Sequence, residues 1–171
     1  MTGGFTAVTT MIELNQGRPV NTVFRDNYVH DIHNHNWNIL VSTPSVSPFA
    51  SADHDNNTYF NITASTILLN HFEEGILTQT NFLIDSCEST QWLINCLYEE
   101  EYHLINSTIR NSRIVNTDSG AMIAAVAFTN KIRLQNVTIE DSSSGSSPML
   151  SIRNSIKGVE IVDCTFEDIG K

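Results

Sequence analysis

The sequence predicts an all-β fold, a parallel solenoid in which three short strands form each coil. Three observations indicate this fold. Apolar and polar residues alternate as they do in strands, the alternation breaks at a polar residue, and the break recurs about every 27 residues. We expect about five to six coils in a single domain covering residues 1–171, because 171 residues are enough to bury one core.

The stretch "IRLQNVTIED" shows the break most clearly. Ile132 and Leu134 are apolar and alternate with polar residues, but after Asn136 the apolar positions shift by one, to Val137 and Ile139. The stretch "VEIVDCTFED" repeats the pattern with an aspartate at the break. Side chains alternate between the two faces of a strand, so a bend that keeps one face on the core must leave one residue outside the alternation.

Asparagine and aspartate suit such a bend, because their short side chains bond to nearby backbone groups and tolerate the left-handed conformation. We expect these residues to face inward and to stack about 4.8 Å apart in successive coils. The predicted ladder comprises Asn106, Asn136 and Asp163.

Apolar positions on both sides of the break also recur, and each set should form a column of contacts through the core. One predicted column contains Leu104, Leu134 and Ile161. The other contains Phe82, Ile109, Ile139 and Phe166. Phe82 comes from a weaker copy of the motif, "QTNFLI", and a copy near "NTYF" has a poor register.

In chain order, residues 1–20 are expected to be irregular or part of a first coil. Residues 41–58 fit no coil and are expected to form a lateral loop. Motif copies read "DNYVHD", "NSTIRN", "NVTIED" and "DCTFED", and a further strand follows as "WLINCL", "AMIAAVAF" and "MLSI". A β-sandwich of many short strands is the alternative, but it requires no register break at a fixed period.

The pattern resembles the right-handed parallel β-helix, the architecture of pectate lyases, polygalacturonases, phage tailspikes and many surface adhesins. An asparagine ladder commonly occupies the tight turn between the second and third strands in those proteins. Asn106, Asn136 and Asp163 match that position. The resemblance covers about residues 20 to 168 and implies the architecture, without pointing to one enzyme family.

Composition excludes some partners. The chain has 19 acidic and 9 basic residues, a net charge of −10, which disfavours nucleic acid and anionic membranes. No stretch approaches the roughly 18 apolar residues of a membrane-spanning helix. Cys87 and Cys96 are interpreted as either a disulfide or buried thiols.

Four Asn-x-Ser/Thr sequons, at Asn56, Asn61, Asn106 and Asn136, favour a secreted protein. Inward-facing ladder residues could not carry glycans, so Asn56 and Asn61 are the candidate glycosylation sites.

The sequence contains only weak candidates for catalytic, metal-binding or sugar-binding sites. His33 and His35 would share a strand face and could hold a transition metal, but a polar turn after the first motif copy is the favoured interpretation. "NTDSG" resembles an element of polygalacturonases, but Asp118 lacks the second carboxylate that glycoside hydrolysis needs. "YEEEYH" is a calcium candidate or a solvated turn, and Trp37 could stack on a sugar. We expect no catalytic residues, no metal site and no cofactor.

These observations favour a structural β-solenoid block of an extracellular or cell-surface assembly, such as a filament or an adhesin. The expected partners are copies of the chain or neighbouring segments of the same polypeptide, joined end to end, because the last coil has no capping sequence. A polysaccharide-cleaving enzyme and a glycan-binding tailspike or adhesin module are the alternatives.

Overall fold

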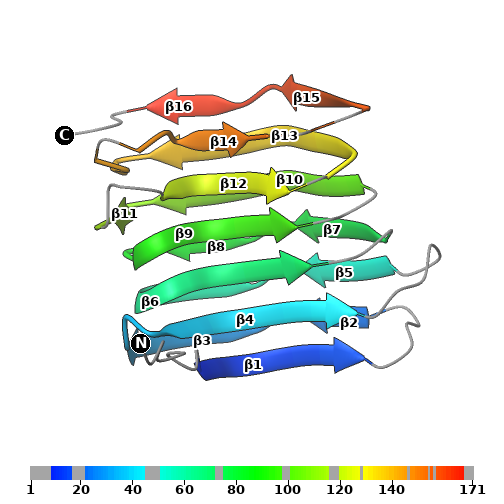
Figure 1. Cartoon of the computed structure of the whole chain (residues 1–171). Helices are drawn as coiled ribbons and strands as arrows, with labels where there is room; N and C mark the ends of the chain where they lie inside the picture. Colours follow the sequence, from blue (N-terminus) through cyan, green and yellow to red (C-terminus); the bar gives the residue numbers. More distant parts are fainter. Residues whose placement is uncertain are drawn as a thin grey trace, which may run out of the picture.

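The computed structural model describes residues 9–16, 22–44, 51–71, 75–97, 101–115, 120–127, 129–145, 147–153, 155 and 157–167. Within these residues the structure contains sixteen β-strands and no helix. Every strand pairing is parallel, and partners come from successive passes of the chain. The strands therefore stack as the rungs of a solenoid, from β1 at one end to β15 and β16 at the other (Figure 1). The predicted all-β, parallel solenoid is confirmed.

Three columns of paired strands, here named faces A, B and C, run the length of the solenoid. Face A contains β2 (Thr22–Arg25), β5 (Ser51–Asp55), β7 (Ile76–Thr80), the first half of β10 (Glu101–Arg110), the first half of β13 (Lys131–Glu140) and β15 (Gly158–Val162). Face B contains β3 (Tyr28–His33), the first half of β6 (Thr58–His71), β8 (Leu83–Asp85), the second halves of β10 and β13, and β16 (Thr165–Glu167).

Face C lies opposite the other two (Figure 1). It contains β1 (Thr9–Gln16), β4 (Trp37–Pro44), the second half of β6, β9 (Glu88–Leu97), β12 (Ala121–Ala127) and β14 (Leu150–Ile152). The short strand β11 (Arg113–Ile114) pairs with the start of β9. The solenoid makes about four turns, slightly fewer than the five to six coils expected.

Two corners turn the chain within each coil, and both use the left-handed conformation. The first corner, between faces A and B, comprises Asp26, Asn56, Asn81, Asn106, Asn136 and Asp163, with φ between 50° and 57°. The second, five residues further on between faces B and C, comprises Asp31, Asn61, Ser86, Asn111 and Asp141, with φ between 45° and 56°. Ten of these eleven residues are Asn or Asp, the residue types that tolerate this conformation best apart from glycine.

The ladder residues face solvent, which corrects the expectation that they point inward. Asn106, Asn136 and Asp163 are all exposed. The next residue enters the core instead, and Ser107 and Val137 are buried. A left-handed residue shifts the alternation because its own side chain points outward and the following side chain points inward. The register break therefore occurs where it was predicted, but the corner side chain points to solvent and not to the core.

One predicted segment differs from the structure, and a second agrees with one of its two predicted alternatives. The expected lateral loop over 41–58 is largely strand, because β4 continues to Pro44, β5 spans Ser51–Asp55 and β6 begins at Thr58. Positions 45–50 lie outside the described residues. In the region 1–20, expected to be irregular or a first coil, β1 is a strand paired with β4, and the remaining positions lie outside the described residues.

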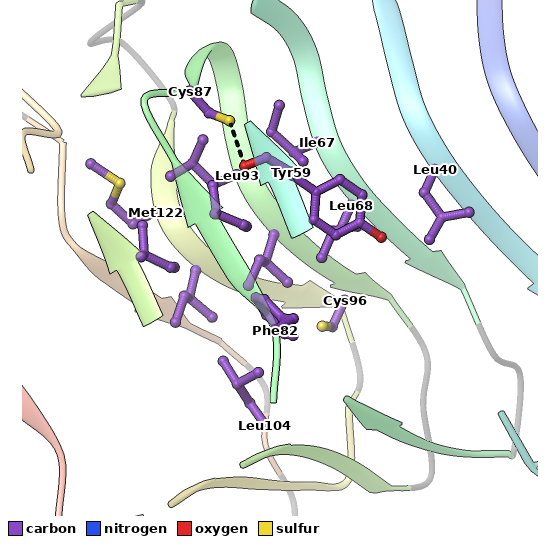
Figure 2. Close-up of a cluster of buried hydrophobic side chains, with 14 of the residues drawn as sticks. Leu40, Tyr59, Ile67, Leu68, Phe82, Cys87, Leu93, Cys96, Leu104 and Met122 are labelled. Carbon is purple, nitrogen blue, oxygen red and sulfur yellow. Dashed lines mark hydrogen bonds between the residues drawn. The ribbon is translucent and has the colours of Figure 1, made fainter. Parts of the chain in front are cut away.

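The core fills the space between the three faces, and Figure 2 shows a part of it around Tyr59, Leu68 and Leu93. Leu104 pairs in register with Leu134, and Ile109 with Ile139, and all four side chains are completely buried. Phe82 is buried, but it does not lie in the predicted column with Ile109 and Ile139. Ile84 is the residue paired with Ile109, and the backbone of Phe82 bonds to Ser107. The weak motif copy therefore begins at Asn81, two residues later than expected.

Candidate functional site

The end of the solenoid formed by β15 and β16 exposes apolar side chains that belong to the core columns. Val159, Ile161 and Phe166 are 44%, 48% and 38% exposed. Their register partners one coil earlier, Ile132, Leu134 and Ile139, are at most 1% exposed.

Both strands pair with β13 along one edge, and no other described strand pairs with them. This end, which we call the open end, combines exposed apolar side chains with strand edges that no other described strand pairs with. Figure 1 shows β15 and β16 at this end of the stack.

The two ends of the solenoid have complementary steps. At the open end, β15 and β16 add a rung to faces A and B, and β14 is the last described strand of face C. At the other end, β1 adds a rung to face C, below β4. A coil arriving at the open end with a face C strand first would therefore continue the staircase in register.

Successive coils are joined at their corners by bonds from asparagine amides to aspartate carboxylates. In each case the asparagine belongs to the later coil. The Nδ2–Oδ1 distances are 2.6 Å for Asn56–Asp26, 2.5 Å for Asn61–Asp31, 2.8 Å for Asn81–Asp55 and 2.9 Å for Asn111–Asp85. In the predicted ladder, the Asn136 amide likewise donates to Asn106 Oδ1 at 3.0 Å. Within the described part of the chain, no asparagine amide donates to Asp163.

These bonds stabilise the ionised carboxylates. Hydrogen bonds from His30 and then Asn61 lower the pKa of Asp31. Bonds from Thr80 and then Asn81 lower the pKa of Asp55. Partial burial raises the pKa of Asp85, but bonds from Asn111, Arg110 and Ser86 outweigh it, so the net shift is downward. Charge-assisted donation from the next coil is thus the common way in which this fold accommodates a corner carboxylate.

A polar groove of about 440 Å³ lies beside the first corner, on the outer side of face A. Its lining residues are Arg25, Asp53, Asp55, Thr78, Thr80, Asn81 and Asn106. Arg25 forms an ion pair with Asp53 across neighbouring strands, and this interaction raises the pKa of the guanidinium.

The groove was not predicted from the sequence, because residues 41–58 were expected to form a lateral loop. The alternation in "ADHD" was the available signal, since it sends His54 inward and the two aspartates outward.

The inner side of face A carries a buried chain of polar groups. Tyr102 donates from its hydroxyl to Gln79 Oε1 at 2.8 Å, and Gln79 Nε2 lies 3.2 Å from His54 Nδ1. His54 and Gln79 occupy the column of Leu104 in the two preceding coils. Burial lowers the pKa of His54 to about 4, opposed in part by the nearby Asp53 charge, and its Nε2 has no hydrogen-bond partner among the described residues.

The sequence-predicted metal and thiol residues are placed as follows. His33 lies exposed on β3 near Thr63, and His35 is exposed in the following turn, 4.0 Å from Glu88. Among the described residues, no group of three or more His, Cys, Asp or Glu side chains is arranged to hold a metal. Cys87 and Cys96 are buried thiols with no disulfide between them. Cys87 Sγ donates to the Tyr59 carbonyl, and burial raises the pKa of this thiol to about 12 (Figure 2).

All four sequon asparagines lie at corners. Asn56, Asn106 and Asn136 are exposed, and Asn61 is half-buried. Asn106 and Asn136 were expected to be inaccessible to glycosylation, but both side chains face solvent. Three other candidates lie outside the described part of the structure. They are Asn116–Ser119 of "NTDSG", Tyr98–Glu100 of "YEEEYH", and the side chain of Trp37.

No protein-family model matches this chain, and no curated protein or solved structure is significantly similar to it. The assignment to a parallel β-solenoid therefore depends on the strand pairing alone. No described helix is long and apolar enough to cross a membrane.

Proposed function

We propose that this chain is a structural block of an extracellular or cell-surface β-solenoid assembly, and that a further solenoid coil stacks on its open end. The observation that carries the proposal is the exposure of Ile161, which continues the buried column of Leu104 and Leu134. Fully burying an aliphatic or aromatic side chain contributes about 1.5–3 kcal/mol, so half-exposed residues each leave about 1 kcal/mol for a partner to gain.

Two further features support this role. The free edges of β15 and β16 offer backbone groups to a parallel strand, and the complementary steps of the two ends allow a coil to continue in register. Sequons at exposed corners, and a surface in which asparagine and threonine replace most charges, suit an extracellular setting.

Sedimentation of the purified chain over a concentration series tests the proposal. The net charge of −10 makes copies repel one another, so the measurement belongs in about 1 M salt, where the Debye length is about 3 Å. We expect end-to-end association of the wild-type chain, and its loss in Ile161→Lys, which places a charge in the contact.

Val162→Lys is the matched control, because Val162 lies on the same strand with its side chain on the opposite, outer side. This variant should associate like the wild type. Equal loss in both variants, or a wild type that stays monomeric at high salt, would contradict the proposal.

The polar groove favours glycan binding as a second candidate function. Its carboxylates, guanidinium, hydroxyls and amides are the donors and acceptors that bind sugar hydroxyls, and they are gathered on one accessible face. A glycan array should show binding that Asp53→Asn reduces severalfold. Asp141→Asn, which removes the same charge at a corner residue outside the groove lining, should leave binding unchanged. Binding indifferent to Asp53 would place the glycan elsewhere.

A further inference from the structure

Four carboxylates at or beside the corners follow one rule of pairing. Asp26, Asp31, Asp55 and Asp85 each accept a hydrogen bond from an asparagine in the next coil. Asp26 and Asp31 are themselves left-handed corner residues, and Asn56 and Asn61 stand at the same corner one coil later.

Asp163 occupies the first corner of the coil at the open end. Its φ of 53° matches those of Asp26 and Asn136, and its side chain is exposed. It is thus a corner carboxylate of the same kind as Asp26, but within the described residues no later coil supplies an asparagine to it.

We propose that the partner stacking on the open end is a β-solenoid coil with an asparagine at its first corner, whose amide donates to Asp163. The inference depends on the proposed function and specifies the partner. It also implies that the first coil of a second copy is a disfavoured partner at low ionic strength, because that coil presents Asp26 at this corner.

The chemistry of the corner decides between these two partners. In a head-to-tail pair of copies, the carboxylates of Asp163 and Asp26 would meet at the rung spacing of about 4.8 Å with no amide between them. Two like charges at this distance repel, whereas an amide in place of one gives a charge-assisted hydrogen bond. Arg25 forms an ion pair with Asp53 and also attracts the Asp26 carboxylate, so it reduces this repulsion, but it does not supply the amide that the other corner carboxylates receive.

The backbone alone does not make this distinction. The steps at the two ends would allow a second copy to continue the staircase, with β1 over β14 and β2 over β15. The side chain at the first corner therefore acts as the selective element, accepting a coil that carries asparagine and opposing self-stacking at low ionic strength.

Self-association of four proteins at low ionic strength tests the inference, measured by sedimentation. The proteins are the wild type, Asp26→Asn, Asp163→Asn and Asp141→Asn. Either of the first two substitutions restores an amide–carboxylate pair at the junction, so each should tighten association by about tenfold or more relative to the wild type. Asp141→Asn removes the same charge from a corner in the preceding coil and should match the wild type.

The outcomes are separable. Wild-type association as tight as that of Asp26→Asn and Asp163→Asn would overturn the inference and leave the proposed function standing. An equal gain in Asp141→Asn would also overturn it, by showing that net charge alone controls assembly. Absence of association in all four proteins, at low and at high salt, would overturn the inference together with the proposed function. Because Asp26 and Asp163 lie in different coils, a folding defect in one variant leaves the other as a complete test.

Discussion

The left-handed corner residue is the feature that sets the register of this fold. Asn136 has φ of 51° and is exposed, so its side chain contributes little packing. Its amide donates to Asn106, but a single exposed hydrogen bond contributes modestly to stability. The main requirement at this position is therefore a backbone that adopts positive φ at low cost.

Two substitutions at this corner separate the backbone requirement from the hydrogen bond. Asn136→Ala should lower the free energy of unfolding by about 1–2 kcal/mol, because a Cβ without a local polar bond disfavours the left-handed region. Asn136→Gly loses the same hydrogen bond but keeps the backbone freedom, and should cost less than Ala. Urea unfolding followed by circular dichroism measures both. A glycine variant as unstable as the alanine variant would show that the ladder bond, and not the backbone conformation, dominates.

At the scale of strands, the parts that could be predicted are those where apolar alternation is complete. The strands β10 and β13 repeat the same pattern of burial, and Leu104 and Leu134 lie in register as their sequences indicate. Prediction failed where polar residues occupy core positions. In β5 the inward residue with described burial is His54, so the segment read as a loop, and the groove on its outer side was missed with it.

The same cause explains the misplaced motif copy. In β7, Gln79 takes the place that leucine has in later coils, and Phe82 follows the corner, where other coils have a smaller residue. A search for apolar positions therefore selected Phe82 instead of Ile84. The second corner was hidden for a different reason, since both ends of the six-residue motif are polar and only backbone angles show that each is left-handed.

At the scale of the whole molecule, the open end had a partial sequence signal. The apolar residues Val159, Ile161 and Phe166 are visible in the sequence, but their exposure depends on which strands pair above and below them. The asparagine–aspartate pairs could not be predicted without the register between coils, because the partners lie 26 to 30 residues apart and sequence alone fixes that separation only approximately.

The interior polar chain makes a prediction for the stability of the whole solenoid in acid. His54 is buried and its pKa is lowered to about 4, whereas an unfolded histidine titrates near 6.5. Between these values the unfolded chain binds a proton that the folded chain excludes, so the free energy of unfolding should fall as the pH drops from about 6.5 to about 4, by roughly 3 kcal/mol in total. The carboxylates with lowered pKa, on Asp31, Asp55 and Asp85, affect stability only at still lower pH, where they become protonated.

Urea midpoints measured between about pH 6.5 and about pH 4 should decline in the wild type and in His33→Leu, whose histidine is exposed. They should decline much less in His54→Leu, which replaces the titrating group with the side chain that Leu104 and Leu134 already provide in the same column. An unchanged decline in His54→Leu would mean that the acid sensitivity of the solenoid resides in its surface carboxylates and not in its core.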